Sequence, residues 1–169
     1  MAGFTVNSSR FDPYKSSKFL VYFGISTTPV AGVSKVTGLK RTTDPIEYKE
    51  GGNANTLQGL GGRAKWEPIT LERGISHDMD FHTWANAAFK LDKGSPAVSL
   101  KDLRRDIRIE LLNEAGQAVH RYIVHRCWVS EFQALPDLDA NGTTVALEHL
   151  KIVHEGWEKD LVLTEPKEI

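Results

Sequence analysis

Alternating hydrophobic and polar positions recur along most of the chain and predict a protein built mainly of β-strands. The run KFLVYFG near the N-terminus is apolar on both faces, whereas the later runs alternate. Pro68 lies inside one run and cannot donate a backbone hydrogen bond, so it predicts a sheet edge or a bulge at that position. The strands expected from this pattern span residues 19–23, 30–38, 46–50, 65–73, 106–112, 118–132 and 143–154.

A helical period replaces the alternation between Ser76 and Leu91. Ser76 is the expected N-cap, and Gly94 and Pro96 are expected to end the helix. The apolar stripe of this helix consists of Phe81, Trp84, Ala85, Ala88 and Phe89. Because strands and helices do not alternate along the chain, the sequence predicts a mainly β fold. We expect an antiparallel β-sandwich or barrel with one flanking α-helix at about residues 76–91.

The length of 169 residues fits one domain over residues 1–169, with a loose N-terminal arm at 1–17 and a loose C-terminal tail at 158–169. A formal net charge of −1 gives no bulk attraction to nucleic acid or to an acidic membrane surface. The N-terminus lacks the apolar region of a secretory signal, and no stretch approaches the about 20 apolar residues of a membrane span. We therefore expect folding in the cytosol and no membrane insertion by this chain alone.

The glycine-rich stretch GGNANTLQGLGGR, residues 51–63, contains a loose match to the dinucleotide-binding pattern G-x-G-x-x-(G/A). That pattern binds a pyrophosphate only where a helix follows the glycines directly. Here the residues after Ala64 are KWEPITLERG, which predict a strand, and no glycine is followed by Lys-Ser or Lys-Thr. The stretch is therefore expected to be a hairpin tip, either flexible or ordered against another chain.

The chain contains residue types that could bind a metal or catalyse a reaction, but their spacing and positions do not suit either role. The six histidines fall in pairs five residues apart, which places the two members of a pair on opposite faces of a strand. Cys127 is the only cysteine, so no intrachain disulfide can form, and its place in a strand predicts an inert thiol. No Gly-x-Ser-x-Gly motif is present. The sequence predicts no catalytic residue, no metal site and no cofactor, and the protein is not expected to be an enzyme.

Glu148 shares a predicted strand face with Ala146, Leu150 and Ile152, so its carboxylate is expected to point inward. Two interpretations remain open at this point. Glu148 is either a structural carboxylate, paired for instance with an arginine, or part of a buried ion pair at a seam between subunits.

The order of the segments resembles the tail tube proteins of contractile phages and the inner-tube proteins of phage-tail-like contractile injection systems. The resemblance runs from about residue 12 to about residue 157 and rests on the ordered set rather than on any one motif. The segments are FLVYFG, VSKVTGL, IEYKEGG, the glycine-rich stretch, ITLERG, a Trp-bearing helix, RDIRIELLNEAGQAVHRYIVHRCWVSEF and VALEHLKIVHEG.

The resemblance implies a structural protein whose hexameric rings stack into a rigid tube. A contractile sheath would surround the tube, a baseplate or initiator would start it, and a protein effector or DNA would travel in its lumen. The implied fold is similar to that of the haemolysin-coregulated protein of type VI secretion. The particle would be assembled in the bacterial cytoplasm and could be released from the cell.

The resemblance also implies that residues 44–65 form an extended hairpin loop that reaches the next ring. The residues expected to make this inter-ring contact are Glu47, Lys49, Glu50, Gly51, Gly52, Asn53, Gly59, Gly61, Gly62, Arg63 and Lys65.

Two alternatives remain beside the stacked tube. One is a type VI-like secreted ring that carries an effector and stacks less firmly. The other is a monomeric β-barrel that binds a small ligand, which would need a closed apolar pocket.

Overall fold

The computed structural model describes residues 6–7, 10, 12–48, 58–92 and 103–168, and within them it forms β-strands and one α-helix. The helix is α1 (Asp80–Asp92). The strands are β1 (Phe19–Phe23), β2 (Val33–Val36), β3 (Arg41–Tyr48), β4 (Gln58–Trp66), β5 (Ile69–Gly74), β6 (Arg105–Leu112), β7 (Ala118–Gln133), β8 (Leu147–Val153) and β9 (Trp157–Lys159).

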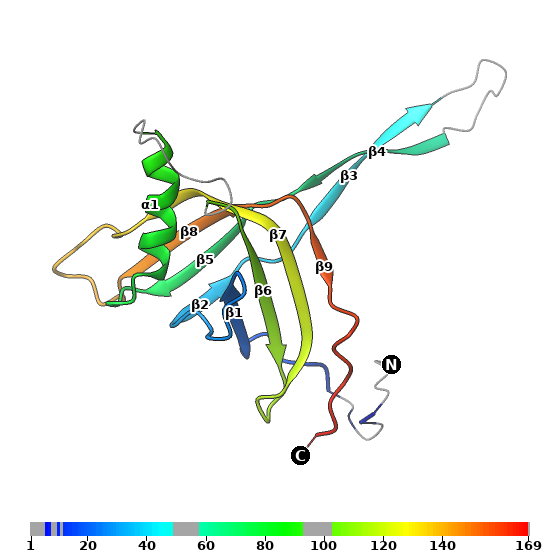
Figure 1. Ribbon diagram of the computed structural model, residues 1–169, viewed down its shortest axis with the longest axis horizontal. Helices are drawn as coiled ribbons and strands as arrows, with labels where there is room; N and C mark the ends of the chain where they lie inside the picture. Colours follow the sequence, from blue (N-terminus) through cyan, green and yellow to red (C-terminus); the bar gives the residue numbers. More distant parts are fainter. Residues whose placement is uncertain (1–5, 8–9, 11, 49–57, 93–102, 169) are drawn as a thin grey trace.

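The long strand β7 belongs to two sheets that pack as layers of one sandwich (Figure 1). Its first half pairs with β6 and β9, and β6 pairs in turn with β1. Its second half pairs with β8, and the order then continues through β5 to β2. All of these pairings are antiparallel, which confirms the predicted fold of a mainly antiparallel β-sandwich with one flanking helix.

A bulge at Arg126 divides the two halves of β7. The register with β6 changes between Arg105 and Ile107, so that His125 and Arg126 together oppose Asp106. Arg126 adopts φ of 53°, which is unusual for a residue with a side chain, and its backbone N–H donates to Asp106 Oδ1 at 2.8 Å. Bulges of this kind allow one strand to leave one sheet and enter another.

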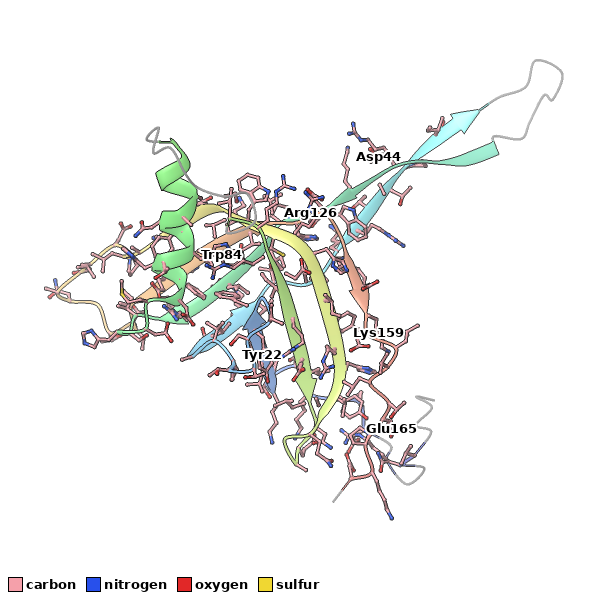
Figure 2. The ribbon with its side chains drawn as sticks, in the orientation of Figure 1. Tyr22, Asp44, Trp84, Arg126, Lys159 and Glu165 are labelled. Atoms are coloured by element: carbon pink, nitrogen blue, oxygen red, sulfur yellow. The ribbon has the colours of Figure 1, made fainter. Side chains whose placement is uncertain are left out.

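Helix α1 covers the sandwich with three residues of the predicted apolar stripe, Phe81, Trp84 and Ala85. Phe81 and Trp84 are completely buried, and the Phe23 and Trp84 rings meet edge to face at 4.7 Å. The Trp84 indole Nε1–H donates to the Leu103 carbonyl at 3.0 Å, so this large side chain is buried without an unsatisfied donor. Figure 2 shows Trp84 between α1 and the strands. No helix of the described residues combines the length and the hydrophobicity that a bilayer crossing needs.

The ends of several elements differ from the sequence expectations. Helix α1 begins at Asp80 rather than Ser76, because Asp78 Oδ1 accepts from the Asp80 N–H at 2.8 Å and marks the start of the helix. Residues 65–73, expected as one strand, contribute to both β4 and β5, with Glu67 and Pro68 between them. Strand β9 was not expected, since three residues with two charges give no clear alternation. Gly94 and Pro96 lie outside the described residues.

The C-terminal tail, expected to be loose, forms hydrogen bonds with the N-terminal arm. The Glu165 carboxylate accepts from the backbone N–H groups of Val6 and Asn7 at 3.0 and 3.3 Å, and from the Asn7 side chain at 2.7 Å. The Glu168 N–H donates to Asn7 Oδ1 at 3.0 Å. The described parts of the arm and of the tail therefore lie side by side, where Figure 2 labels Glu165.

Cys127 lies in the core, and its burial raises the pKa of the thiol to about 12, with a contribution from the negative charge of Asp106. We expect the native protein to react with a thiol reagent at pH 8 about a thousandfold more slowly than an exposed cysteine of pKa about 8.5, because the thiolate is the reactive form. Absorbance at the release of the aromatic thiolate measures the rate, and the protein unfolded in guanidinium chloride is the control. Complete labelling of the native protein within minutes would contradict the prediction.

Candidate assembly interface

Strands β3 and β4 form a two-stranded hairpin that projects away from the sandwich (Figure 1). The two strands pair with each other from Arg41↔Trp66 to Tyr48↔Gln58, and neither pairs with a strand of the other described elements. Both outer edges of the hairpin therefore present backbone N–H and C=O groups that a strand or loop of another chain could bind. The described parts of the predicted inter-ring loop of residues 44–65, which are 44–48 and 58–65, belong to this hairpin.

A bulge in the hairpin depends on one glycine. The register shifts between Thr43 and Pro45, so that Gly62 and Arg63 oppose Asp44. A Cβ atom on Gly62 would overlap the Asp44 carbonyl oxygen and touch the Ile46 side chain at 3.0 Å. A Cβ atom on Gly61 would meet no heavy atom within 4 Å. Close packing therefore requires glycine at position 62 but not at position 61.

The surface of the hairpin carries both apolar and charged groups. Ile46 is 53% exposed, which is unusual for a large aliphatic side chain. Glu47 and Arg63 are exposed and form no ion pair within the described part of the chain. Lys65 instead pairs with Asp44, Nζ to Oδ2 at 2.8 Å, across the hairpin that Figure 2 marks with Asp44. The hairpin thus offers an apolar side chain between charges that remain available to a partner.

The base of the hairpin rests on an aromatic cluster that the sequence does not predict. The Trp66 ring lies 5.9 Å from the Trp157 ring and 6.2 Å from the His154 ring, measured between centroids. The Arg41 guanidinium lies over the Trp66 ring, 5.5 Å from its centroid. Because Trp157 belongs to β9, these contacts connect the hairpin to the sheet that contains β7.

A shallow groove of about 370 Å³ lies beside this base and is lined mainly by apolar side chains of β1, β2, β6, β7, β9 and the segment after β2. The groove is open rather than closed within the described residues, so it does not provide the enclosed pocket that a monomeric ligand-binding barrel would need. Its lining residues include Phe19, Val36, Leu39, Ile109, Leu111, Tyr122 and Trp157.

Glu148 points into the sandwich and pairs with a buried arginine of its own chain. Arg73 is 1% exposed, and its Nε donates to Glu148 Oε1. Arg73 also donates from Nη2 to the Asp78 carbonyl at 2.6 Å, and its Nη1 lies 3.1 Å from Asp78 Oδ1. The Asp80 N–H and the Arg73 guanidinium lower the pKa of Asp78, against the effect of burial. The guanidinium further lies 4.1 Å from the Phe81 ring centroid, so it ties β5 and β8 to the start of α1.

The described residues hold no cluster of three or more His, Cys, Asp or Glu side chains that could bind a metal ion. The arrangement they do show is a rigid sandwich with a projecting hairpin, open strand edges and internally paired charges. Such an arrangement is suited to contact between protein subunits.

A sequence profile of the family described as T4-like virus tail tube protein gp19 matches residues 15–158. The chain belongs to this tail tube family. It is a structural tube protein rather than an enzyme. No curated protein sequence matches the chain.

Solved structures share the fold at low sequence identity. A chain in the extended sheath-tube complex of the PVC extracellular contractile injection system is 20% identical over 94% of this chain and 99% of its own length, with a TM-score of 0.73. A chain in the anti-feeding prophage baseplate is 21% identical over 89% of this chain and 97% of its own, with a TM-score of 0.72. A chain of the native gene transfer agent virion is 11% identical over 88% of this chain and 99% of its own, with a TM-score of 0.55.

The structure brings part of the predicted contact set of this tail tube protein together on the hairpin. Gly59, Gly61, Gly62, Arg63, Lys65 and Glu47 lie on β3 and β4. Lys49, Glu50, Gly51, Gly52 and Asn53 lie outside the described residues. The contact of these residues with a neighbouring ring stays a prediction. Glu148 has the arginine partner that one interpretation expected, and its place at a subunit seam also stays a prediction.

Sequence reasoning missed Trp66, His154 and Trp157 as the support of the hairpin. The available signal was only that Trp66 stands near the start of one predicted strand and that Trp157 follows the end of another by three residues. Such a signal does not identify which aromatic side chains meet.

Replacing Gly62 with alanine should disrupt the hairpin, whereas Gly61→Ala provides a matched control one residue away. We expect Gly62→Ala to force the Asp44 bulge open, so that the backbone amides of β3 and β4 exchange hydrogen about tenfold faster. Hydrogen exchange followed by mass spectrometry measures this rate, and Gly61→Ala should leave it within about twofold. Equal exchange in the two variants would be inconsistent with the bulge.

Replacing Glu148 with alanine should destabilise the protein by about 3 kcal/mol, because it leaves the buried Arg73 charge with Asp78 as its remaining partner. Urea unfolding followed by tryptophan fluorescence measures the free energy of unfolding. Glu131→Ala, which removes an exposed carboxylate 3.7 Å from Lys151, is the control and should cost less than about 1 kcal/mol. A loss below about 1 kcal/mol for Glu148→Ala would show that the buried pair does not stabilise the fold.

Proposed function

We propose that six copies of this tail tube protein form a ring and that the rings stack into the inner tube of a contractile injection particle or phage tail. The observation that carries the proposal is the β3–β4 hairpin, which projects from the sandwich with both edges unpaired among the described residues. A hairpin whose described strands pair only with each other is a suitable element to reach the next ring.

Contacts within a ring are proposed at the ends of the sheets. Strands β1 and β2 are the two end strands of the order β1-β6-β7-β8-β5-β2. Val21 in β1 is almost fully buried on its sheet face, although the strand lies at the end of the sheet. Joining of such edges between neighbouring subunits would continue the sheets around the ring and line a lumen.

We propose that stacked rings are held together by many copies of the same hairpin contact. Each subunit of a closed ring would contribute one hairpin, so a new ring would bind through several equivalent contacts at once. Even contacts that are weak one at a time then hold the ring firmly. This expectation favours a tightly stacked tube over a secreted ring that stacks loosely.

The proposed partners follow from the particles in which the fold occurs. The similar chains come from a six-fold symmetrised baseplate of the anti-feeding prophage, the cap that terminates its tube, and a sheath-tube complex of the PVC system. For this chain we propose a surrounding sheath protein, a baseplate or initiator, and a cargo of protein or DNA in the lumen. Assembly is proposed in the bacterial cytoplasm, with the finished particle able to act outside the cell.

Charge reversal on the hairpin tests the proposal. The double variant Glu47→Lys, Glu50→Lys should form rings but shorten the stacked tubes by at least about tenfold, because new positive charges would meet the surface that accepts the hairpin. Electron microscopy of negatively stained samples measures tube length, and the thermal unfolding temperature checks the fold.

The neutral double variant Glu47→Gln, Glu50→Gln keeps the side-chain size and should give tubes of intermediate length. Gly61→Pro, which removes a backbone donor from β4, should also leave the subunit folded and stop stacking. Tubes of normal length from the lysine variant would refute the role of the hairpin in stacking.

A further inference from the structure

The turn between β8 and β9, residues 154–156, contacts the base of the hairpin through both its backbone and its side chains. His154 is buried at the end of β8, and Gly156 precedes β9. Trp66 and Glu67, at the end of β4, lie against them. The two pairs of residues are far apart in the sequence, and their contacts connect the hairpin to the sandwich.

His154 uses both of its ring nitrogens in this connection. The backbone N–H of Gly156 donates to Nδ1 at 3.2 Å, and Nε2 lies 3.0 Å from the Glu67 carbonyl oxygen. A backbone N–H can only donate and a carbonyl can only accept, so the partners assign the neutral tautomer with the proton on Nε2. The imidazole therefore accepts from its own turn and donates to the last residues of the hairpin.

Gly156 lies against the Trp66 ring in a backbone conformation that favours glycine. Its φ of 140° is a conformation that side chains rarely adopt, and a Cβ atom there would lie 3.4 Å from the Trp66 ring. The glycine thus provides both the backbone conformation of the turn and a flat surface on which the indole rests.

The opposite side of the same turn is fixed to the bulge of β7. The His125 N–H donates to the Gly156 carbonyl at 2.9 Å, and the Glu155 N–H donates to the His125 carbonyl at 3.1 Å. The Glu155 carboxylate pairs with Arg104 and lies 3.2 Å from Arg126 Nε. The turn is therefore bound on one side to the place where the two sheets meet, which Figure 2 marks with Arg126, and on the other side to the hairpin.

We propose that His154, Gly156 and Trp66 form a latch that sets the direction in which the β3–β4 hairpin leaves the sandwich. The residues of this latch are positioning residues. They orient the hairpin, and the hairpin makes the proposed contact with the next ring. The consequence for assembly rests on the proposed function of the hairpin in stacking.

The length of the hairpin makes its direction important. Strand β3 has 8 residues, so at about 3.4 Å per residue it reaches about 27 Å from its base. A swing of about 10° at the base then moves the far end by about 5 Å, which exceeds the tolerance of a hydrogen bond. A latch at the base therefore decides whether the hairpin meets its proposed binding surface.

Two substitutions of His154 distinguish loss of the latch from a general loss of stability. In His154→Asn the side-chain amide occupies the place of Nδ1, so it can accept from Gly156 but cannot reach Glu67. In His154→Gln the amide reaches the place of Nε2, so it can donate to Glu67 but leaves Gly156. Each variant loses one hydrogen bond, and only the asparagine variant loses the bond to the hairpin.

Distance measurements between paired spin labels test the latch on the full chain without assembly. The labels are placed at Glu47→Cys on the hairpin and Glu131→Cys on β7, while the buried Cys127 stays unreactive. We expect one narrow distance distribution for the wild type and for His154→Gln, and a distribution at least about twice as wide for His154→Asn. An asparagine variant as narrow as the wild type, or a glutamine variant as broad as the asparagine variant, would overturn the proposal.

A pair of glycine substitutions provides an independent check. Gly156→Ala strains a turn that contacts Trp66, whereas Gly116→Ala strains a turn with φ of 83° and no heavy atom within 4 Å of the added Cβ. We expect only Gly156→Ala to broaden the distance distribution. Equal broadening by both variants would attribute the effect to general strain and would reject the latch.

Assembly of the same variants distinguishes the latch from the proposed function. If the latch sets the direction for stacking, His154→Asn should shorten tubes at least tenfold while His154→Gln assembles as the wild type does. Normal tubes from an asparagine variant with a broadened distribution would refute this consequence for assembly. A wild type that forms no ring or tube would reject the proposed function, and the distance measurement would still decide on the latch.

Discussion

The structure depends on one strand that serves two sheets. Strand β7 pairs with β6 and β9 before the bulge at Arg126 and with β8 after it. The bulge is held by the hydrogen bond from the Arg126 N–H to Asp106. Because the sheets diverge at this point, they enclose the core between them, and α1 can cover it with Phe81 and Trp84. A straight β7 would leave these side chains without a common interior.

The same bulge connects the interior of the protein with its projecting hairpin. The turn at residues 154–156 is bound to His125 and Arg126 on one side and to Trp66 and Glu67 on the other. The buried Arg73–Glu148 pair fixes the neighbouring strands β5 and β8 to the start of α1. The buried charges of Arg73 and Glu148 are thus paired within the subunit, while the hairpin keeps exposed groups for a partner. This division agrees with a family whose members build a tube instead of catalysing a reaction.

The alternating pattern of apolar residues predicted the fold class, and the three- and four-residue spacing predicted the buried face of α1. The inert thiol expected of Cys127 from its place in a strand agrees with its burial in the core. These properties depend on the local sequence, because the spacing at which apolar residues recur shows which face of a strand or helix is buried. The glycine-rich stretch predicted a hairpin tip, and only the resemblance to tail tube proteins predicted an extended hairpin that reaches another ring, since composition alone gives it no direction.

Contacts between distant segments could not be predicted in the same way. Arg126 has a positive φ, which is more common for glycine, and an arginine in the sequence does not predict a bulge. The hydrogen bonds between the tail and Asn7 depend on how the chain ends meet after folding. The same holds for Trp66 on Gly156, since two residues 90 positions apart in the sequence give no local signal of their contact. The choice of Arg73 as the partner of Glu148 likewise required the register of β5 and β8.

Cryo-electron microscopy of the purified protein over a range of concentrations is the most direct test of the central claim. The account predicts hollow rings of six subunits that stack head to tail, with the β3–β4 hairpin of each subunit in contact with the adjacent ring. A protein that remains monomeric at every concentration, including in the presence of preformed tube ends, would contradict it. Stacked rings whose hairpins contact no neighbouring ring would contradict it equally.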